Sequence, residues 1–404
     1  MTRKTAIKPG YKHNPLPDGW RVAEFGVLAR VLKAKHLPSE RAHLTCIELE
    51  HMEQETGQLV GNTDSSLQRS TKNVFKKGQV LFGKLRPYLK KYWLAQFDGV
   101  CSSEIWVLES IDPGCSNEFL FRFIQQHLFI QVANVSSGSK MPRADWDFVS
   151  EYPFAIPSTP EQAQIITILA VWDTAISKTQ QLIAEKDKRK KALMKLLLTG
   201  KKRLPGFTKK WKVRPLDEVL IPTLRPVEKP GSAFLALGIR SHGKGTFLKQ
   251  EFDPSKIEMD TLYTVRENDL IVNITFAWEG AIAIAGRQDN GALVSHRFPA
   301  YTFNGKGGVV DYFRYVIVQP QFKYMLGLIS PGGAGRNRVL DKTDFLKLDL
   351  KLPDVEEQSA IASVLRAADK ELDVLRSKLD ALKDQKKGLM QKLLTGRIRV
   401  RTSR

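Results

Sequence analysis

The sequence predicts an α+β fold: two mixed α/β domains, related by approximate two-fold symmetry, separated by an antiparallel coiled coil of two long helices from the same chain. Three observations lead to this prediction. A stretch from Pro157 to Gly200 occurs again, without a gap, from Pro353 to Gly396. Both copies have the apolar spacing of a long amphipathic helix. Each copy follows a globular segment with a similar layout, and such internal repetition indicates a repeated architecture.

The two copies share residues over the whole stretch at a constant offset of 196 positions. An ungapped match of this extent indicates that the two segments have the same structure. The shared residues are Glu161/Glu357, Gln162/Gln358, Ile165/Ile361, Leu169/Leu365, Asp173/Asp369, Lys190/Lys386, Lys191/Lys387, Leu193/Leu389, Met194/Met390, Leu197/Leu393, Leu198/Leu394 and Thr199/Thr395.

Each copy is predicted to form one long helix, because a proline precedes its first turn and a glycine follows its last. A helix of roughly 40 residues is about 60 Å long at ~1.5 Å per residue. Apolar residues at steps of three and four form a seam of the kind found in coiled coils. The residues expected to pair the helices are Leu169, Trp172, Ile176, Ile183, Leu193 and Leu197 in the first copy, and Leu365, Leu372, Leu375, Leu379, Leu382, Leu389 and Leu393 in the second.

A single helix of this length with one apolar stripe needs a partner, and the other copy is the simplest one. The alternative is a pair of unrelated amphipathic helices, each packed on its own domain. The matching register and length favour pairing between the copies, head to tail.

The globular segment before the first helix has the pattern of short strands and helices. Strands are predicted at Val80–Phe82, Tyr92–Ala95 and Ile105–Leu108, because each is a β-branched or aromatic run between turn signals. An amphipathic helix is predicted from Phe119 to Val132, followed by a loop from Ser136 to Pro142.

The same order returns after the first long helix. Trp211 opens the second globular segment as Trp20 opens the first. A strand at 269–273, a helix from Tyr312 to Leu328 and a loop from Ser330 to Gly335 take the places of their counterparts. The predicted divisions are an N-terminal segment at 1–20, the first domain at 21–156, the first long helix at 157–203, the second domain at 204–352, and the second long helix with a basic tail at 353–404.

The chain of 404 residues carries a formal net charge of +20, which favours a polyanionic partner and above all nucleic acid. The sequence has no run of about 18 apolar residues, which is the length that would predict a membrane span. The N-terminal stretch MTRKTAIKPG does not have the pattern of a signal peptide. Three cysteines, Cys46, Cys101 and Cys115, are too few for a disulfide framework. These features predict a cytoplasmic protein.

Motifs for catalysis or cofactor binding are not found. The sequence has no P-loop for ATP and no glycine-rich dinucleotide fingerprint. His36, His43, Cys46 and His51 are close in sequence, but their spacing is not that of a zinc finger or ribbon. We therefore expect a chain that recognises a partner and has no catalytic, cofactor-binding or metal-binding residues.

Basic and aromatic side chains in each domain are candidates for contacts with duplex DNA, since lysine and arginine bind phosphates and polar side chains read base edges. For any one of them, a solvated surface position is the alternative. The candidates are Lys84, Arg86, Tyr88, Lys90, Lys91, Ser137, Lys140 and Arg143 in the first domain, and Asn273, Thr275, Trp278, Arg297, Arg336, Asn337 and Arg338 in the second. Basic runs at 186–191 and 201–203, and the C-terminal arginines, are usually solvated faces in proteins, and contact with DNA phosphates or acidic partner surfaces is the alternative.

The chain resembles the specificity (S) subunit of a Type I restriction–modification system. The residues that carry the resemblance are Leu16-Pro-Asp-Gly-Trp20, Leu204-Pro-Gly-Phe207 with Trp211, Ile156-Pro with Glu161-Gln162, Leu352-Pro with Glu357-Gln358, and the helix ends Leu193–Gly200 and Leu389–Gly396. They cover nearly the whole chain, although Val355 and Glu356 depart from the Pro-Glu-Gln start that Thr159–Gln162 keeps.

This resemblance implies two target-recognition domains, each reading half of a bipartite site on double-stranded DNA. It implies that the coiled coil sets the unread spacer and docks two methyltransferase (M) subunits, and that two restriction (R) subunits join the full complex. S-adenosylmethionine would belong to M, and ATP and Mg²⁺ to R. The alternatives are a coiled-coil scaffold that binds proteins, a fused methyltransferase–nuclease, and a specificity subunit of another restriction type.

Overall fold

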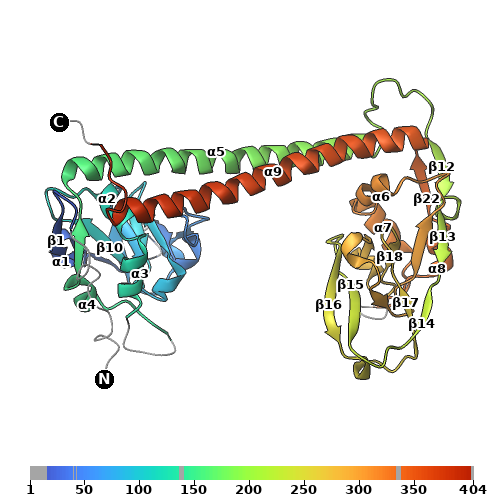
Figure 1. Cartoon of the computed structure of the whole chain (residues 1–404), viewed down its shortest axis with the longest axis horizontal. Coiled ribbons are helices and arrows are strands. Elements are labelled where there is room, and N and C mark those ends of the chain that lie inside the picture. The colour runs from blue at the N-terminus through green and yellow to red at the C-terminus, as the bar shows by residue number, and fades with distance from the viewer. Residues whose placement is uncertain (1–15, 40, 42, 136–140, 334–337, 402–404) are drawn as a thin grey trace. The chain divides into compact units, whose positions relative to one another are not determined.

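The computed structural model describes residues 16–39, 41, 43–135, 141–333 and 338–401. The chain divides into two compact units. Unit 1 contains residues 1–180 and 377–404, and unit 2 contains residues 181–376. The two long helices, α5 (Thr159–Leu197) and α9 (Val355–Leu394), each contribute residues to both units. The prediction of two sheet-rich α/β parts and long helices is confirmed at this level (Figure 1).

Unit 1 holds the strands and short helices that precede α5. They are β1 (Arg21–Glu24), α1 (Phe25–Leu28), β2 (Ala29–Val31), β3 (Lys35–His36), β4 (Thr45–Ile47), β5 (Thr63–Asp64), β6 (Lys72–Phe75), β7 (Val80–Gly83), β8 (Tyr92–Leu94), β9 (Gly99–Cys101), β10 (Ile105–Ser110), α2 (Asn117–Phe123), α3 (His127–Ala133), α4 (Trp146–Ser150) and β11 (Pro153–Ile156). The three strands predicted in this segment correspond to β7, β8 and β10.

Unit 2 holds the elements between α5 and α9. They are β12 (Lys212–Pro215), β13 (Leu220–Thr223), β14 (Pro226–Glu228), β15 (Phe234–Ile239), β16 (Thr246–Phe252), β17 (Thr261–Thr264), β18 (Leu270–Val272), β19 (Ile282–Ile284), β20 (Leu293–Val294), β21 (Ala300–Phe303), α6 (Val310–Val316), α7 (Pro320–Leu328), α8 (Lys342–Leu346) and β22 (Asp349–Leu352).

The two units have the same strand topology. In unit 1 the sheets run β1-β11, β2-β10-β7-β8 and β3-β6-β9-β4-β5; in unit 2 they run β12-β22, β13-β21-β18-β19 and β14-β17-β20-β15-β16. Corresponding pairs also share direction, since β4–β9 and β15–β20 are parallel and the other pairs are antiparallel. The internal repeat seen in the sequence is therefore present in the fold.

The predicted helix from Phe119 to Val132 is wrong in one respect, because the structure has two helices there, α2 and α3. Phe123 and Phe129 both pack on the Phe25 ring, with centroids 6.0 and 5.0 Å away. Residues six apart in one continuous helix point about 120° apart around its axis, and the break between α2 and α3 lets both rings face Phe25.

The corresponding prediction in unit 2, a helix from Tyr312 to Leu328, is corrected in the same way. The structure has α6 and α7, and Pro320 is the first residue of α7. Proline has no backbone N–H and is well tolerated only in the first turn of a helix. Pro320 was therefore the sequence signal that marked this break.

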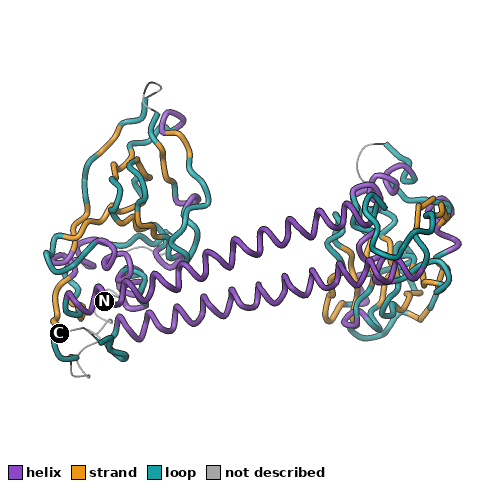
Figure 2. Tube along the Cα trace, turned by 90° about the horizontal axis from the view of Figure 1, so that it is seen from above, coloured by secondary structure: helices purple, strands orange, loops and turns teal. Residues whose placement is uncertain are grey.

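The ends of the long helices pack into the core of each unit. In unit 1, Ile165 and Leu169 of α5 are buried together with Met390 and Leu393 of α9. In unit 2, Leu197 of α5 is buried with residues 361, 362 and 365 of α9. Within unit 1 the start of α5 and the end of α9 lie side by side in both views (Figures 1 and 2). All the predicted seam residues are buried or half-buried.

Both long helices stop at the predicted glycines. Gly200 and Gly396 adopt φ values of +69° and +70°, in the left-handed region that glycine tolerates best. The backbone N–H of Lys202 donates to Leu196 O at 3.2 Å, and that of Ile398 donates to Lys392 O at 3.1 Å. These bonds satisfy carbonyls of the last turn, as is common where a helix ends at a left-handed glycine. No helix in the described ranges has the length and hydropathy needed to cross a membrane.

Candidate nucleic-acid interface

A buried glutamate fixes the start of α5 in unit 1. The Glu161 carboxylate accepts a hydrogen bond from Trp20 Nε1 at 2.7 Å and two from the Arg399 guanidinium, at 2.8 and 3.1 Å. Arg399 also donates to the Asp18 carbonyl at 2.8 Å. A buried carboxylate is stable only when it is paired and hydrogen-bonded, so this cluster holds the helix start, the Trp20 segment and the basic tail together.

Unit 2 contains the equivalent cluster, offset by the repeat. Glu357, at the start of α9, accepts from Trp211 Nε1 at 3.0 Å and from Arg203 at 2.5 and 2.6 Å. Arg203 donates further to the Lys209 carbonyl at 2.9 Å. In each unit, the arginine that follows the end of one long helix thus binds the glutamate at the start of the other long helix. Arg203 and Arg399 thus bind within these clusters, and contact of the basic runs with DNA phosphates or partner surfaces stays a prediction.

An aspartate on each long helix joins that helix to its neighbours. In unit 1, Asp173 of α5 accepts from Lys386 of α9 at 2.5 Å and pairs with Arg122 of α2 at 2.6 Å. In unit 2, Asp369 of α9 pairs with Lys190 of α5, and it accepts from the Tyr315 hydroxyl of α6 at 2.7 Å. Each carboxylate therefore ties together both long helices and a short helix of its unit.

The basic run at 186–191 is largely occupied by interactions with the helices themselves. Lys186 pairs with Glu371 of α9, and Lys191 pairs with Asp187 one turn earlier on α5 at 2.7 Å. Together with the Lys190–Asp369 pair, these contacts leave fewer cations of this run for a partner than the sequence suggested.

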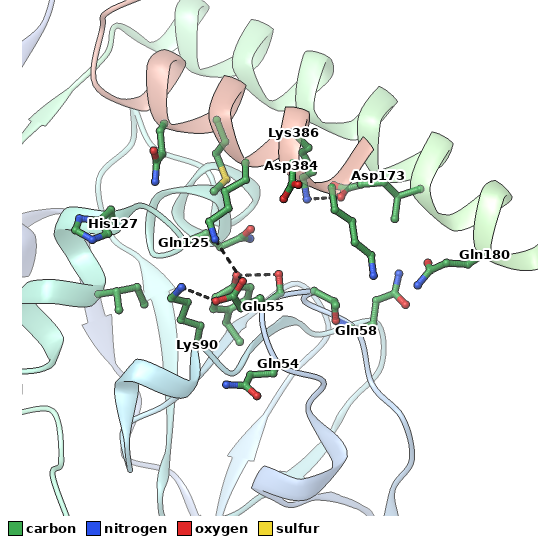
Figure 3. Close-up of a pocket in the computed structure, with 18 residues that line it drawn as sticks. Gln54, Glu55, Gln58, Lys90, Gln125, His127, Asp173, Gln180, Asp384 and Lys386 are labelled. Carbon is green, nitrogen blue, oxygen red and sulfur yellow. Dashed lines mark hydrogen bonds and ion pairs between the residues drawn. The ribbon is translucent and has the colours of Figure 1, made fainter. Parts of the chain in front are cut away.

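A cavity of about 320 Å³, lined mainly by polar residues, lies beside Asp173 in unit 1 (Figure 3). On the side of the cavity away from the long helices, the Glu55 carboxylate pairs with Lys90, and at 3.6 Å with Lys387 of α9. The hydrogen bond from Lys90 lowers the pKa of Glu55 below its ordinary value. The loop that carries Glu55 is thereby attached to the helix. In unit 2 the corresponding connection consists of residues 240–245 between β15 and β16. It is much shorter than the segment 48–62 that joins β4 and β5 in unit 1.

The side chains of two candidates in this area, Lys90 and Lys91, bind other groups of the chain. Lys90 pairs with Glu55, and Lys91 Nζ donates to the Leu49 carbonyl at 2.6 Å. Both ammonium groups thus hold the loop that follows β4, and their role in DNA contact stays a prediction. Local sequence patterns cannot reveal these partners, since they lie 35 and 42 residues away.

Two candidate segments that were predicted separately meet at one place in unit 1. Arg86 N donates to the Pro142 carbonyl at 2.7 Å, and Ala144 N donates to the Lys84 carbonyl at 2.8 Å. Arg86 has a left-handed backbone with φ +53°, and its side chain is exposed, as is that of Tyr88. Arg143 forms two bonds to Glu104, at 2.9 and 3.1 Å. The turn after β7 and the segment before α4 thus form one basic surface, in which Lys84 and Arg86 have no acidic partner among the described residues.

Unit 2 repeats this junction with other residues. Ile274 N donates to the Arg297 carbonyl at 3.0 Å, and Leu340 N donates to the Ile274 carbonyl at 2.9 Å. Asn273 accepts from Thr275 N at 3.1 Å, which fixes the turn after β18. Arg297 is exposed. These bonds bring the candidates at 273, 275 and 297 to one place.

Two other candidates of unit 2, Arg338 and Trp278, contact each other, and Arg338 also binds the end of α7. The guanidinium of Arg338 donates to the carbonyls of Ser330 and Gly327, at 3.1 and 2.9 Å, at the end of α7. It also lies 5.3 Å from the centroid of the Trp278 ring. The assignment of Arg338 and Trp278 to DNA contact stays a prediction. Four further candidates, Ser137, Lys140, Arg336 and Asn337, lie outside the described residues.

Two of the histidines in the first domain, His43 and His51, have protein partners, and Cys46 is a buried thiol. His43 lies 3.1 Å from Asp64, and His51 Nδ1 accepts from the Glu48 backbone at 3.0 Å. Burial raises the pKa of the Cys46 thiol to about 11, so this thiol stays protonated near neutral pH. Within the described ranges, no cluster of three or more histidine, cysteine, aspartate or glutamate side chains is arranged to hold an ion.

Comparisons with known proteins agree with the fold and with the resemblance seen in the sequence. Residues 49–185 match the family described as the Type I restriction modification DNA specificity domain. The EcoDI specificity subunit of a type I restriction enzyme of Escherichia coli is 31% identical over 156 residues, which are 37% of this chain and 34% of that protein. The chain thus matches about a third of that relative's length.

Two further similarities extend over more of the chain. The MjaVIII specificity subunit of a type I restriction enzyme of Methanocaldococcus jannaschii is 23% identical over 328 residues, 75% of each chain. A chain solved in work on complex assembly and conformational transition of the type I R-M system has the same fold, with a TM-score of 0.62 at 17% identity, covering 95% of this chain and 100% of that one. The predicted resemblance to Type I specificity subunits is confirmed.

Proposed function

We propose that this chain, which carries a Type I restriction modification DNA specificity domain, is the non-catalytic DNA-recognition subunit of a Type I restriction–modification complex. The observation that carries this proposal is the duplication: two units of identical strand topology each contain the same buried glutamate–arginine–tryptophan cluster. A protein that reads a bipartite site needs two such readers in one chain.

Each unit reads one half of the site through the surface that follows its central strand. In unit 1 this surface contains Lys84, Arg86 and Tyr88, and in unit 2 it contains Asn273, Thr275 and Arg297. Arginine and lysine contact phosphates and guanine edges, whereas asparagine pairs with adenine. Residues paired inside the protein, such as Arg143 and Arg338, position these surfaces.

The helices α5 and α9 form an antiparallel coiled coil that relates the two readers by approximate two-fold symmetry and sets the unread spacer. The ion pairs Lys386–Asp173 and Lys190–Asp369 support this arrangement, since each repeats the other at the same offset. The outer faces of these helices would dock two M subunits, and two R subunits would join for restriction. S-adenosylmethionine would be bound by M, and ATP and Mg²⁺ by R.

A binding selection on randomised duplex DNA tests the proposal, with the full chain assembled with an M subunit of its own system. We expect enrichment of two short sequences separated by a gap of fixed length, and affinity that falls steeply as salt rises. Recovery of one contiguous site, or binding without sequence preference, would overturn the bipartite reading. Binding of protein partners without retention of DNA would support the scaffold alternative.

A further inference from the structure

Unit 2 has an open recess on the sheet β14-β17-β20-β15-β16, of about 430 Å³. Its wall is rich in phenylalanine: Phe234, Phe247, Phe252, Phe276 and Phe298 all line it and are all half-buried. Pockets for small molecules typically measure about 300–1,000 Å³ and have apolar walls with a few polar groups. The recess has the size and wall chemistry of a ligand site.

Two cations lie against these rings. The guanidinium carbon of Arg240 is 5.1 Å from the centroid of Phe247, and Lys249 Nζ is 5.9 Å from Phe247 and 5.5 Å from Phe252. Within the described part of the chain, neither side chain has an acidic partner, although Arg240 donates to the Thr246 carbonyl. The recess therefore suits an occupant that combines a flat ring with negative charge.

Polar groups at the rim suit the edge of such a ring. Asn273 lines the recess, and its Oδ1 accepts from Thr275 N, so its amide N–H groups can donate to a ligand. The carboxylate of Glu279, which also lines the recess, accepts from Ser241 at 2.6 Å through Oε2, and its other oxygen can act as a further acceptor. Asn273 also belongs to the proposed DNA-reading surface, so the recess adjoins it.

Unit 1 differs at the corresponding connection. Residues 48–62 between β4 and β5 form a long segment, and its Met52 and Leu59 pair with each other and pack with Trp93 in the apolar cluster of that sheet. Between β15 and β16 of unit 2 there are only residues 240–245. The longer segment of unit 1 supplies apolar side chains to its own sheet, whereas the six residues of unit 2 leave the recess open.

We propose that this recess binds a single unpaired nucleotide of the DNA, turned out of the base stack beside the half-site that unit 2 reads. A paired base cannot enter a recess, but a flipped base can stack between aromatic rings and present its edge to polar groups. Arg240 and Lys249 would hold the phosphate, Phe247 and Phe252 the face of the base, and Asn273 its edge. This inference rests on the proposed function.

Mismatched duplexes provide the test, because unpairing a mismatched base costs less and favours proteins that turn a base out. Mismatches are placed one at a time through both half-sites found in the selection. For the full chain with its M subunit, we expect one position in the unit 2 half-site where a mismatch tightens binding by about three- to tenfold. No such position is expected in the unit 1 half-site.

The variant Phe247→Ala with Phe252→Ala should lose this gain while still binding the matched duplex, and Phe247→Tyr should keep it. Should the double variant unfold, as circular dichroism would show, the exposed Lys249→Gln serves instead and should reduce the gain. Matched-duplex binding with no mismatch gain anywhere would overturn this inference and leave the proposed function standing. Failure of the unmutated chain to bind duplex at all would overturn both.

Discussion

Glu161 and Glu357 show how much one buried carboxylate organises. Each begins a long helix and accepts three hydrogen bonds, from a tryptophan and from an arginine that lies after the other helix. Both glutamates were visible in the sequence as shared residues of the repeat. The arginine was not predictable as their partner, because Arg399 lies 238 positions from Glu161.

Replacing Glu161 with Gln should destabilise unit 1 by about 2–3 kcal/mol, since hydrogen bonds to a charged group contribute roughly 1.5–3 kcal/mol. Arg399 would lose its charged partner but is partly exposed and can regain water. Hydrogen exchange should accelerate at the start of α5 and in the 397–401 tail, with unit 2 unchanged. Glu185→Gln, at an exposed position of α5, is the matched control and should change neither.

The contact between the loop that carries Glu55 and α9 should contribute to stability in a way that depends on pH. Its folded pKa lies below the ordinary value, chiefly because of the hydrogen bond from Lys90. A depressed pKa means that the contribution is fully present above the unfolded pKa and is lost as pH falls through the folded pKa. The difference in thermal stability between the protein and Glu55→Gln should therefore be constant from pH 7 to about pH 5 and vanish at lower pH. A difference that grew on acidification would contradict this.

Arg86 and Arg297 are the exposed arginines of the two reading surfaces, and each should affect one half-site only. Arg86→Ala should relax sequence preference in the unit 1 half-site, and Arg297→Ala in the unit 2 half-site. Removing a side chain that reads a base costs about 1–3 kcal/mol in discrimination, whereas removing one that binds a phosphate weakens binding to all sequences and lowers the salt slope by about one. Repeating the selection with each variant distinguishes the two, and Arg30→Ala, whose guanidinium pairs with Glu109, is the control.

At the scale of elements, the sequence predicted the long helices and several strands, but it did not predict every break between short helices. The long helices and the strands at 80–83, 92–94 and 105–110 were visible because periodicity and composition are local properties. The break between α2 and α3 was missed because it depends on Phe25, about 100 residues away. The partners of Lys90, Lys91 and Arg338 within the chain were not predictable, because only the fold brings them together.

Asp173 and Asp369 join the same elements in the two units through different chemistry. Asp173 holds Arg122, whereas Asp369 holds Tyr315, whose pKa is raised above its ordinary value by burial and by the bond to Asp369. Arg122→Ala should therefore loosen α2 from the helices in a salt-dependent way, and Tyr315→Phe should loosen α6 independently of salt. Hydrogen exchange of residues 117–123 and 310–316 at low and high salt would measure this. Equal salt sensitivity of both variants would contradict it.

At the scale of the whole molecule, equal shortening of both long helices should change the spacer between half-sites and nothing else. Asp173 and Lys190 are as far apart on α5 as Asp369 and Lys386 are on α9, so removing 177–183 together with 376–382 keeps both ion pairs. Seven residues of helix measure about 10.5 Å, and a base pair rises about 3.4 Å, so the preferred gap should shorten by about three base pairs. The selection on randomised DNA should return the original half-sites at this shorter gap. Removing 177–183 alone is the control, because it breaks the register of the pair and should abolish high-affinity binding. An unchanged gap after the matched deletion would show that the helices do not set the spacing.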